Sequence, residues 1–229
     1  MMPNYIIYSN LQTFEVDFFD PKYWQDKNQI NKIGIGRADA YLIDLDNQQW
    51  VLKEYRRGGR IGRILSNQYF YLSAKNIRPI KEWKIINQLF LSGLPIPKPI
   101  GLLVSTAPFI YSASLITEYL KDTVTLLDKI MIGGNLNEYY WKSIGITIKK
   151  FHDYGVSHSD LNLRNLLINN KNEIFMIDFD KAFITTKKTY FHSNLKRFKR
   201  SIFKHIRLER EAEMAYQLVL EGYNVNSIA

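Results

Sequence analysis

Cysteine is absent from this chain of 229 residues. The absence excludes a disulfide framework and a thiolate metal site, and it fits a reducing compartment. The length is that of one domain, or of one domain with two lobes. A chain of this size hides roughly 70% of its unfolded surface on folding, so we expect a substantial core.

Long hydrophobic runs are also absent. No stretch reaches the roughly 18 consecutive apolar residues that indicate a membrane-spanning helix. The first residues, Met1 to Tyr5, lack the basic start and the apolar stretch of a signal peptide. We therefore expect no transmembrane segment and no signal peptide, and a protein that stays in the cytosol or on a cytosolic surface.

Acidic residues are scarce in one segment. Residues 181–210 hold ten Lys or Arg and a single acid, Glu209, whereas the remaining residues hold 21 basic and 21 acidic groups. The net charge of +9 therefore lies in one patch. Within it, residues 196–204 interleave basic side chains with Phe198 and Phe203. Two interpretations stay open, a surface that rests on anionic lipid or a solvated helix face with both phenylalanines in the core.

The first half of the chain is mostly β in its local patterns. One helix is expected there, beginning near Pro79, which suits a first helical turn, and ending at Gly93. Its broad apolar face includes Trp83 and Ile86. Turn residues separate the predicted strands, which span residues 31–35, 38–45, 49–55, 100–104 and 111–119.

The second half is mostly helical. Helices are expected over residues 137–154 and, as one or two helices, over 194–220, with a hairpin of strands 166–168 and 174–177 between them. The fold class is therefore α+β with two lobes. We expect a single domain with a β-rich N-lobe (1–119) and a mainly helical C-lobe (120–229), and a ligand site in the cleft between them.

Two short motifs flank this hairpin, His158-Ser-Asp-Leu-Asn-Leu-Arg-Asn165 and Ile177-Asp-Phe-Asp180. The hairpin would bring Asp160, Asn165 and Asp178 to one edge. A carboxylate that orients an acceptor hydroxyl and takes its proton, beside an amide and a carboxylate that hold Mg²⁺, is the equipment of a phosphotransferase. A lone Asp or Asn would be explained as a turn cap, but the set matches in type, spacing and context.

Together these motifs resemble the eukaryotic-protein-kinase-like superfamily. His158, Asp160 and Asn165 are similar to its catalytic-loop pattern, and Asp178-Phe179 is similar to the start of its metal-binding Asp-Phe-Gly. The resemblance implies ATP as the phosphoryl donor and Mg²⁺ as the cofactor. It also implies that Asp160 is the catalytic group and that His158 braces the loop.

The resemblance implies further binding residues upstream. Lys53, on the third predicted strand, would bind phosphate, and Glu82, on the following helix, would pair with it. The interval of 29 residues between them is long for the family, and an exposed helix glutamate is the alternative interpretation of Glu82.

A phosphate-covering loop and an adenine-binding hinge are the remaining parts that the superfamily has. Gly34 and Gly36 lie between the first two predicted strands, where that loop belongs, although a hairpin turn explains them equally well. The segment from Glu118 to Leu120 resembles the hinge, whose backbone would hold adenine.

Two departures from the protein-kinase pattern narrow the class of acceptor. Asp180 replaces the glycine of Asp-Phe-Gly, and the 49 residues that follow it contain no Ala-Pro-Glu segment. We therefore expect a kinase-like fold that lacks an extended activation segment. Because protein kinases use these parts to dock peptides, a small-molecule or glycolipid acceptor is favoured.

Four segments resemble the 3-deoxy-D-manno-octulosonic acid (Kdo) kinases, which are near the lipopolysaccharide core heptose kinases. They are residues 55–62, 93–99, 158–162 and 177–181. The resemblance implies ATP-dependent phosphorylation of the 4-hydroxyl of Kdo on a lipid A precursor, Kdo-lipid IVA. It also implies a peripheral protein on the cytoplasmic face of the bacterial inner membrane, with an anionic membrane surface as partner. We expect no nucleic acid and no obligate protein partner.

Basic residues that follow the third strand suit such an acceptor, since guanidinium groups match carboxylate and phosphate. The candidate acceptor-binding residues are Arg56, Arg57, Arg60 and Arg63. An exposed loop is the alternative interpretation of this cluster. The arginine cluster argues against a cationic acceptor such as an aminoglycoside.

Two other functions stay open on the sequence. One is another small-molecule or sugar kinase of the same superfamily, such as a core heptose kinase. The other is a non-catalytic basic module that uses residues 181–210 on nucleic acid or membrane.

Overall fold

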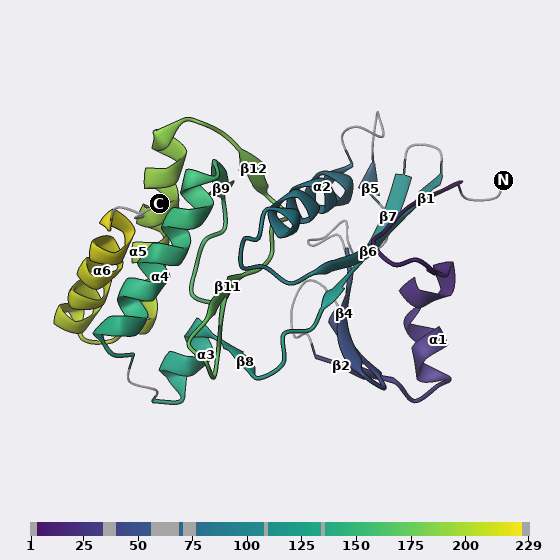
Figure 1. Cartoon of the computed structure of the whole chain (residues 1–229), viewed down its shortest axis with the longest axis horizontal. Helices are drawn as coiled ribbons and strands as arrows, with labels where there is room; N and C mark the ends of the chain where they lie inside the picture. The colour runs from purple at the N-terminus through teal and green to yellow at the C-terminus, as the bar shows by residue number, and fades with distance from the viewer. Residues whose placement is uncertain are drawn as a thin grey trace. The chain divides into compact units, whose positions relative to one another are not determined.

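The structure is a computed structural model, and it describes residues 4–33, 40–55, 69–70, 77–107, 110–133 and 136–225. The chain forms two compact units, the first from residues 1–90 and 97–120, the second from 91–96 and 121–229. A β-sheet dominates the first unit and helices the second (Figure 1), so the expected α+β class is confirmed.

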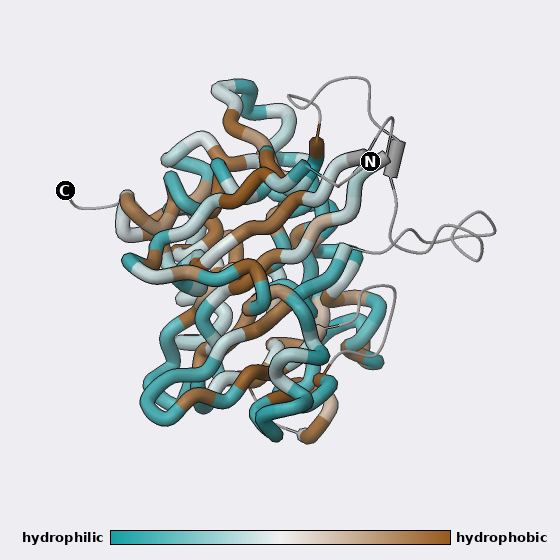
Figure 2. The backbone as a smooth tube through the Cα atoms, turned by 90° about the vertical axis from the view of Figure 1, so that its right-hand side faces the viewer, coloured by the Kyte–Doolittle hydropathy of each residue, from teal (hydrophilic) through white to brown (hydrophobic). Residues whose placement is uncertain are grey.

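An antiparallel sheet with the strand order β1-β6-β7-β4-β3-β2 forms the centre of the first unit, and β5 also pairs with β7. Hydrophobic residues recur along its strands (Figure 2). The elements of this unit are β1 (Asn4–Ser9), η1 (Val16–Phe19), α1 (Pro21–Gln25), β2 (Ile30–Lys32), β3 (Ala40–Leu45), β4 (Gln48–Glu54), β5 (Tyr69–Phe70), α2 (Arg78–Leu91), β6 (Pro99–Ala107) and β7 (Ile110–Glu118).

Strand β4 separates two environments because successive side chains of a strand point to opposite faces. Trp50 and Leu52 are buried in an aromatic cluster with Phe19 and Trp24 of the N-terminal helices. Lys53, on the opposite face of the strand, points toward α2, where its ammonium group meets Glu82. The N-terminal helices and α2 therefore cover opposite faces of this sheet (Figure 1).

The second unit is built around α4, whose N-terminus is capped by Asn137 and whose end is followed by Gly155 at φ +92°. The helix confirms the one predicted over residues 137–154. The elements are β8 (Thr123–Thr125), α3 (Leu126–Met131), α4 (Glu138–Asp153), β9 (Val156–His158), β10 (Leu166–Asn169), β11 (Ile174–Met176), β12 (Ala182–Ile184), α5 (Lys188–His205) and α6 (Glu209–Asn224). Among the described residues, no helix has both the length and the apolar character needed to cross a bilayer.

Helices α4 and α6 meet at two glycines. A Cβ atom on Gly145 would lie 2.0 Å from the carbonyl oxygen of Val219, and one on Gly222 would lie 2.0 Å from that of Lys142. Such distances are impossible for real side chains, so only glycine permits this close approach.

The predicted hairpin is present as β10 and β11, which pair in antiparallel register from Leu166↔Met176 to Ile168↔Ile174. After Asp180 the chain forms β12, which pairs with β9, and α5 already begins at Lys188. The segment between Asp180 and α5 is thus residues 181–187, with no room for an extended activation segment.

Candidate functional site

Lys53, Glu82 and Tyr55 form a cluster of candidate functional residues in the first unit. Lys53 Nζ lies 3.7 Å from Glu82 Oε1, so the expected ion pair is present. The Tyr55 hydroxyl donates to Glu82 Oε2 at 2.6 Å. Glu82 is only 3% exposed, which rules out the alternative of an exposed helix glutamate. A carboxylate buried to this extent requires such partners, and Tyr55 is a contributor that the sequence analysis missed.

Of the other expected nucleotide-binding residues, the structure describes Glu118 and Leu120 but not the two glycines. Glu118 ends β7, and its backbone N–H donates to the carbonyl of Lys98. Leu120 is the last residue of the first unit, so the chain passes to the second unit at the expected hinge. Gly34 and Gly36 lie outside the described residues, as do the four arginines 56, 57, 60 and 63.

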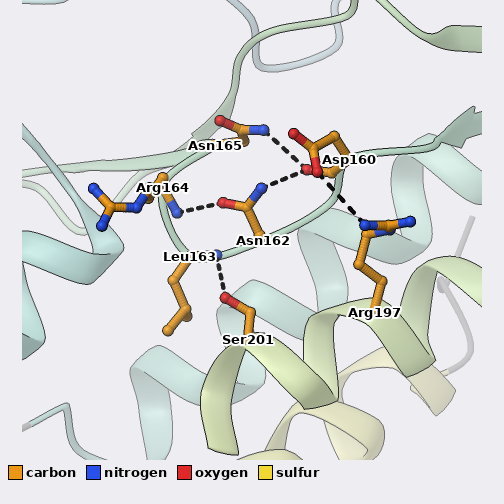
Figure 3. Close-up of polar contacts among 7 residues, drawn as sticks. All are labelled: Asp160, Asn162, Leu163, Arg164, Asn165, Arg197 and Ser201. Carbon is orange, nitrogen blue, oxygen red and sulfur yellow. Dashed lines mark hydrogen bonds and ion pairs between the residues drawn. The ribbon is translucent and has the colours of Figure 1, made fainter. Parts of the chain in front are cut away.

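Asp160 lies in residues 158–165, here called the site loop. Other residues of the loop hold its backbone in place. Leu161 and Leu163 are fully buried, so the loop is anchored by two apolar side chains. The side-chain amides of Asn162 and Asn165 both donate to the carbonyl oxygen of Asp160, at 2.8 and 2.9 Å (Figure 3). The Asp160 carboxylate is left half-exposed, 52% accessible, as a group that meets a ligand must be.

Asn165 and Asp178 are joined through the backbone of Ile177. The Ile177 N–H donates to the Asn165 carbonyl at 3.0 Å. Its own carbonyl accepts a hydrogen bond from His158 Nε2, also at 3.0 Å. Asp178 follows immediately, at φ +64°. Non-glycine residues uncommonly adopt this left-handed conformation, although Asp and Asn do so more readily than other residues. Asp178 therefore lies next to the site loop in a conformation that the surrounding structure imposes.

The oxygen atoms of Asn165 and Asp178 fit a Mg²⁺ ion. Since Asn165 Nδ2 is bound to the Asp160 carbonyl, the amide oxygen is the atom left for a cation. Asp178 is exposed and carries a carboxylate, and both groups are the hard oxygen ligands that Mg²⁺ prefers. Within the described ranges, no three His, Cys, Asp or Glu side chains gather as a metal cluster.

His158 is a structural residue in this arrangement. It is 2% exposed, and burial lowers the pKa of its imidazole below the ordinary value. Because a carbonyl oxygen can only accept, the hydrogen lies on Nε2. The ring also packs against Phe179, with centroids 5.1 Å apart. His158 thus braces the loop against the segment that carries Asp178.

Helix α5 presents three residues along the site loop. The backbone N–H of His158 donates to Asn194 Oδ1 at 2.8 Å, and that of Leu163 donates to Ser201 Oγ at 3.1 Å. Between them, Arg197 Nη1 lies 3.7 Å from Asp160 Oδ1. Positions 194, 197 and 201 share one face of a helix. The sequence analysis missed this contact because it treated the basic segment as a surface.

The same face continues into a buried polar network. Asn194 Oδ1 also accepts from His152 Nε2 at 3.3 Å, while His152 Nδ1 lies 2.9 Å from the Tyr223 hydroxyl. Burial lowers the pKa of His152 to about 4. His152 is therefore neutral in the folded protein at neutral pH, and it ties α4 to α5 and α6.

The structure places the two phenylalanines of the basic segment. Phe198 is fully buried and belongs to the core. Phe203 is half-buried, with Lys199 Nζ 5.0 Å from its ring centroid. Neither phenylalanine is therefore fully exposed on the surface of α5.

Comparison with known proteins assigns this architecture to a family. Residues 21–223 match the model of the "Lipopolysaccharide kinase (Kdo/WaaP) family". Relatives named 3-deoxy-D-manno-octulosonic acid kinase occur in Vibrio vulnificus strain YJ016 and Mannheimia succiniciproducens. Both are 34% identical over 215 residues, covering 91% and 90% of this chain and 89% of each relative. The relative of that name in Xylella fastidiosa strain M23 is 30% identical and covers 90% of this chain and 82% of its own.

Proposed function

The chain belongs to the lipopolysaccharide kinase (Kdo/WaaP) family, and we propose that it transfers the γ-phosphoryl group of ATP to the 4-hydroxyl of Kdo on Kdo-lipid IVA. Relatives named Kdo kinase, which align over nine-tenths of this chain, support the sugar. The observation that carries the chemistry is the site loop, in which two asparagine side chains fix the backbone of Asp160 and leave its carboxylate accessible.

Asp160 acts as the general base of this proposed reaction. Its carboxylate orients the acceptor hydroxyl and takes the proton as the hydroxyl oxygen forms a bond to the γ-phosphorus. The bond from that phosphorus to the bridging oxygen breaks, and ADP leaves. Because phosphoryl transfer depends mainly on position and on charge compensation, the fixed backbone of Asp160 is the main contribution of the loop.

Lys53 would bind the phosphates of ATP, and Glu82 and Tyr55 hold it in place. The backbone from Glu118 to Leu120 would bind adenine, and Gly34 and Gly36 would cover the phosphates. Asn165 and Asp178 would hold Mg²⁺, which offsets the charge that develops on the phosphates. Arg56, Arg57, Arg60 and Arg63 remain candidates for contacts with the acid groups of the acceptor.

The proposed location is the cytoplasmic face of the inner membrane, where a glycolipid acceptor is accessible to a peripheral enzyme. Helix α5 supports a contact with anionic lipid, because it contains six Lys or Arg residues and no acidic residue from Lys188 to His205. Polybasic surfaces of this kind bind anionic headgroups.

The test is phosphoryl transfer from labelled ATP to Kdo-lipid IVA with Mg²⁺. Asp160→Asn keeps the size of the side chain and removes the base, so we expect kcat to fall by roughly 100-fold or more. Asp26→Asn, at an exposed aspartate that follows α1, is the matched control and should match the wild type. Phosphorus NMR of the product identifies the modified hydroxyl. Transfer to heptose instead of Kdo, or undiminished transfer by Asp160→Asn, would contradict the proposal.

A further inference from the structure

Arg197 stands out among the contacts of the site loop because it does not hold the loop backbone. Asn194 and Ser201, on the same face of α5, accept backbone hydrogen bonds of 2.8 and 3.1 Å. Arg197 instead faces the Asp160 carboxylate, with Nη1 3.7 Å from Oδ1 (Figure 3). The loop therefore keeps its position without Arg197.

The Arg197–Asp160 pair is a loose one. Its distance exceeds the usual range of a hydrogen bond, and the side chains are 46% and 52% exposed. A pair of this kind adds little to stability. Among the described residues, Arg197 has no other charged or hydrogen-bonded partner. Most of its five N–H donors are thus available to a ligand that reaches Asp160.

We infer that Arg197 binds the carboxylate of the acceptor sugar and thereby selects an acid sugar for transfer at Asp160. The inference rests on the proposed function. A reacting hydroxyl must lie within hydrogen-bond reach of the Asp160 carboxylate, and Arg197 is adjacent to that carboxylate. The guanidinium group is therefore within one sugar ring of the reacting hydroxyl.

The chemistry of the acceptor matches this position. The relatives are named kinases of an octulosonic acid, a sugar that carries a carboxyl group. A guanidinium group binds a carboxylate through two parallel hydrogen bonds, which fixes orientation as well as charge. Arg197 would exchange its loose contact with Asp160 for this bidentate one, which positions the hydroxyl and leaves Asp160 to accept the proton.

The test compares a deacylated, water-soluble Kdo acceptor with its Kdo methyl ester, which lacks the negative charge. The wild type should show a KM at least ten-fold higher for the ester. Arg197→Gln should raise the KM for the acid by ten-fold or more, leave the KM for ATP unchanged and no longer distinguish acid from ester. Arg197→Lys should restore part of the preference. Arg207→Gln, at an exposed arginine between α5 and α6, is the matched control and should behave as the wild type.

Four results would overturn the inference. If Arg197→Gln lowers kcat equally on acid and ester at unchanged KM, Arg197 acts through Asp160. A raised KM for ATP would assign it to a nucleotide phosphate. A loss that disappears on an acceptor without its lipid phosphates would assign it to those phosphates. A wild type that phosphorylates neither of these Kdo compounds nor Kdo-lipid IVA would reject the proposed function itself, which the wild-type assays alone reveal. Equal unfolding midpoints for all variants show that they fold.

Discussion

Glu82 illustrates, at the scale of single residues, how a buried charge sets the geometry of the first unit. It is almost inaccessible, and its two oxygens are divided between Lys53 Nζ and the Tyr55 hydroxyl. Because Lys53 and Tyr55 lie two positions apart on and just after β4, both point to the same face of the sheet. Tyr55 therefore orients the carboxylate that orients the lysine.

Tyr55→Phe removes a hydrogen bond to a buried carboxylate while it keeps the aromatic ring. We expect the free energy of unfolding to fall by about 1–3 kcal/mol. The KM for ATP should rise several-fold, because Glu82, the partner of Lys53, loses the hydrogen bond that orients it. Denaturant titration and initial rates measure the two effects. Tyr8→Phe, at a tyrosine of the same unit whose hydroxyl has no polar partner among the described residues, is the control. Equal losses in both variants would contradict this role.

The residues of the site were predictable where chemistry and local spacing coincide. Asp160, Asn165 and Asp178 were identified from their types and spacing, and the structure joins them through Ile177. The contact of Arg197 with Asp160 was not predictable, because 37 positions separate them and no local pattern determines which helix face meets a loop. The roles of all these residues stay predictions until the variants are measured.

Helix α5 is, at the scale of elements, the support of the site loop. Its buried residues include Leu195, Phe198 and Ile202, and the adjacent face holds the loop through Asn194 and Ser201. Amphipathic spacing and end signals made the helices α2 and α4 predictable. The β9–β12 pair was missed, since two strands of three residues carry no periodic signal.

Protonation of His152 should loosen the junction of α4, α5 and α6. Its pKa is about 4 in the folded protein, against an ordinary value of 6.5. Below pH 6.5 the imidazole of His152 therefore binds a proton in the unfolded chain, whereas in the folded protein it stays neutral until the pH approaches 4. The stabilisation is complete above that pH and is lost as the pH falls toward 4, by about 2 kcal/mol at pH 5.

Denaturant unfolding between pH 7.5 and pH 5 measures this effect. His158, whose pKa is also lowered by burial, contributes in the same direction, so the comparison is between slopes. His152→Gln should show a shallower loss of stability with falling pH than the wild type. His192→Gln, at an exposed histidine of α5, should keep the wild-type slope. Equal slopes for the wild type and His152→Gln would contradict the assignment.

At the scale of the whole molecule, part of the net charge of +9 lies in an ordered row of side chains on helix α5. Exposed basic or histidine residues recur every fourth position along α5, so they form one stripe on the helix. They are Lys188, His192, Lys196, Arg200 and Lys204. Within the described parts of the chain, none of these five has an ion-pair partner. Arg197 and Lys199 lie off the stripe and pair with Asp160 and Glu213.

Replacement of Lys196, Arg200 and Lys204 by Gln should weaken binding to vesicles that contain phosphatidylglycerol. At about 1 kcal/mol for each cation near the surface, the loss is roughly 100-fold at low salt. The control replaces three exposed lysines elsewhere, Lys84, Lys121 and Lys171, and so removes the same charge. Sedimentation with vesicles measures both variants. Equal binding by the two variants would show that the stripe has no special part in membrane contact.

The contact of Gly145 with Gly222 has a consequence for synthesis. Helix α4 cannot bury its glycine-lined face until α6 is available, because the close approach is formed by no other element. Residues 154–208 separate the two helices in the chain, and they include the site loop and α5. On a ribosome, where folding proceeds from the N-terminus, α4 and the site loop therefore emerge well before the helix that completes their packing. Until α6 has emerged, the nascent second unit exposes the surface of α4 that α6 later covers. This interval is where a chaperone would be needed.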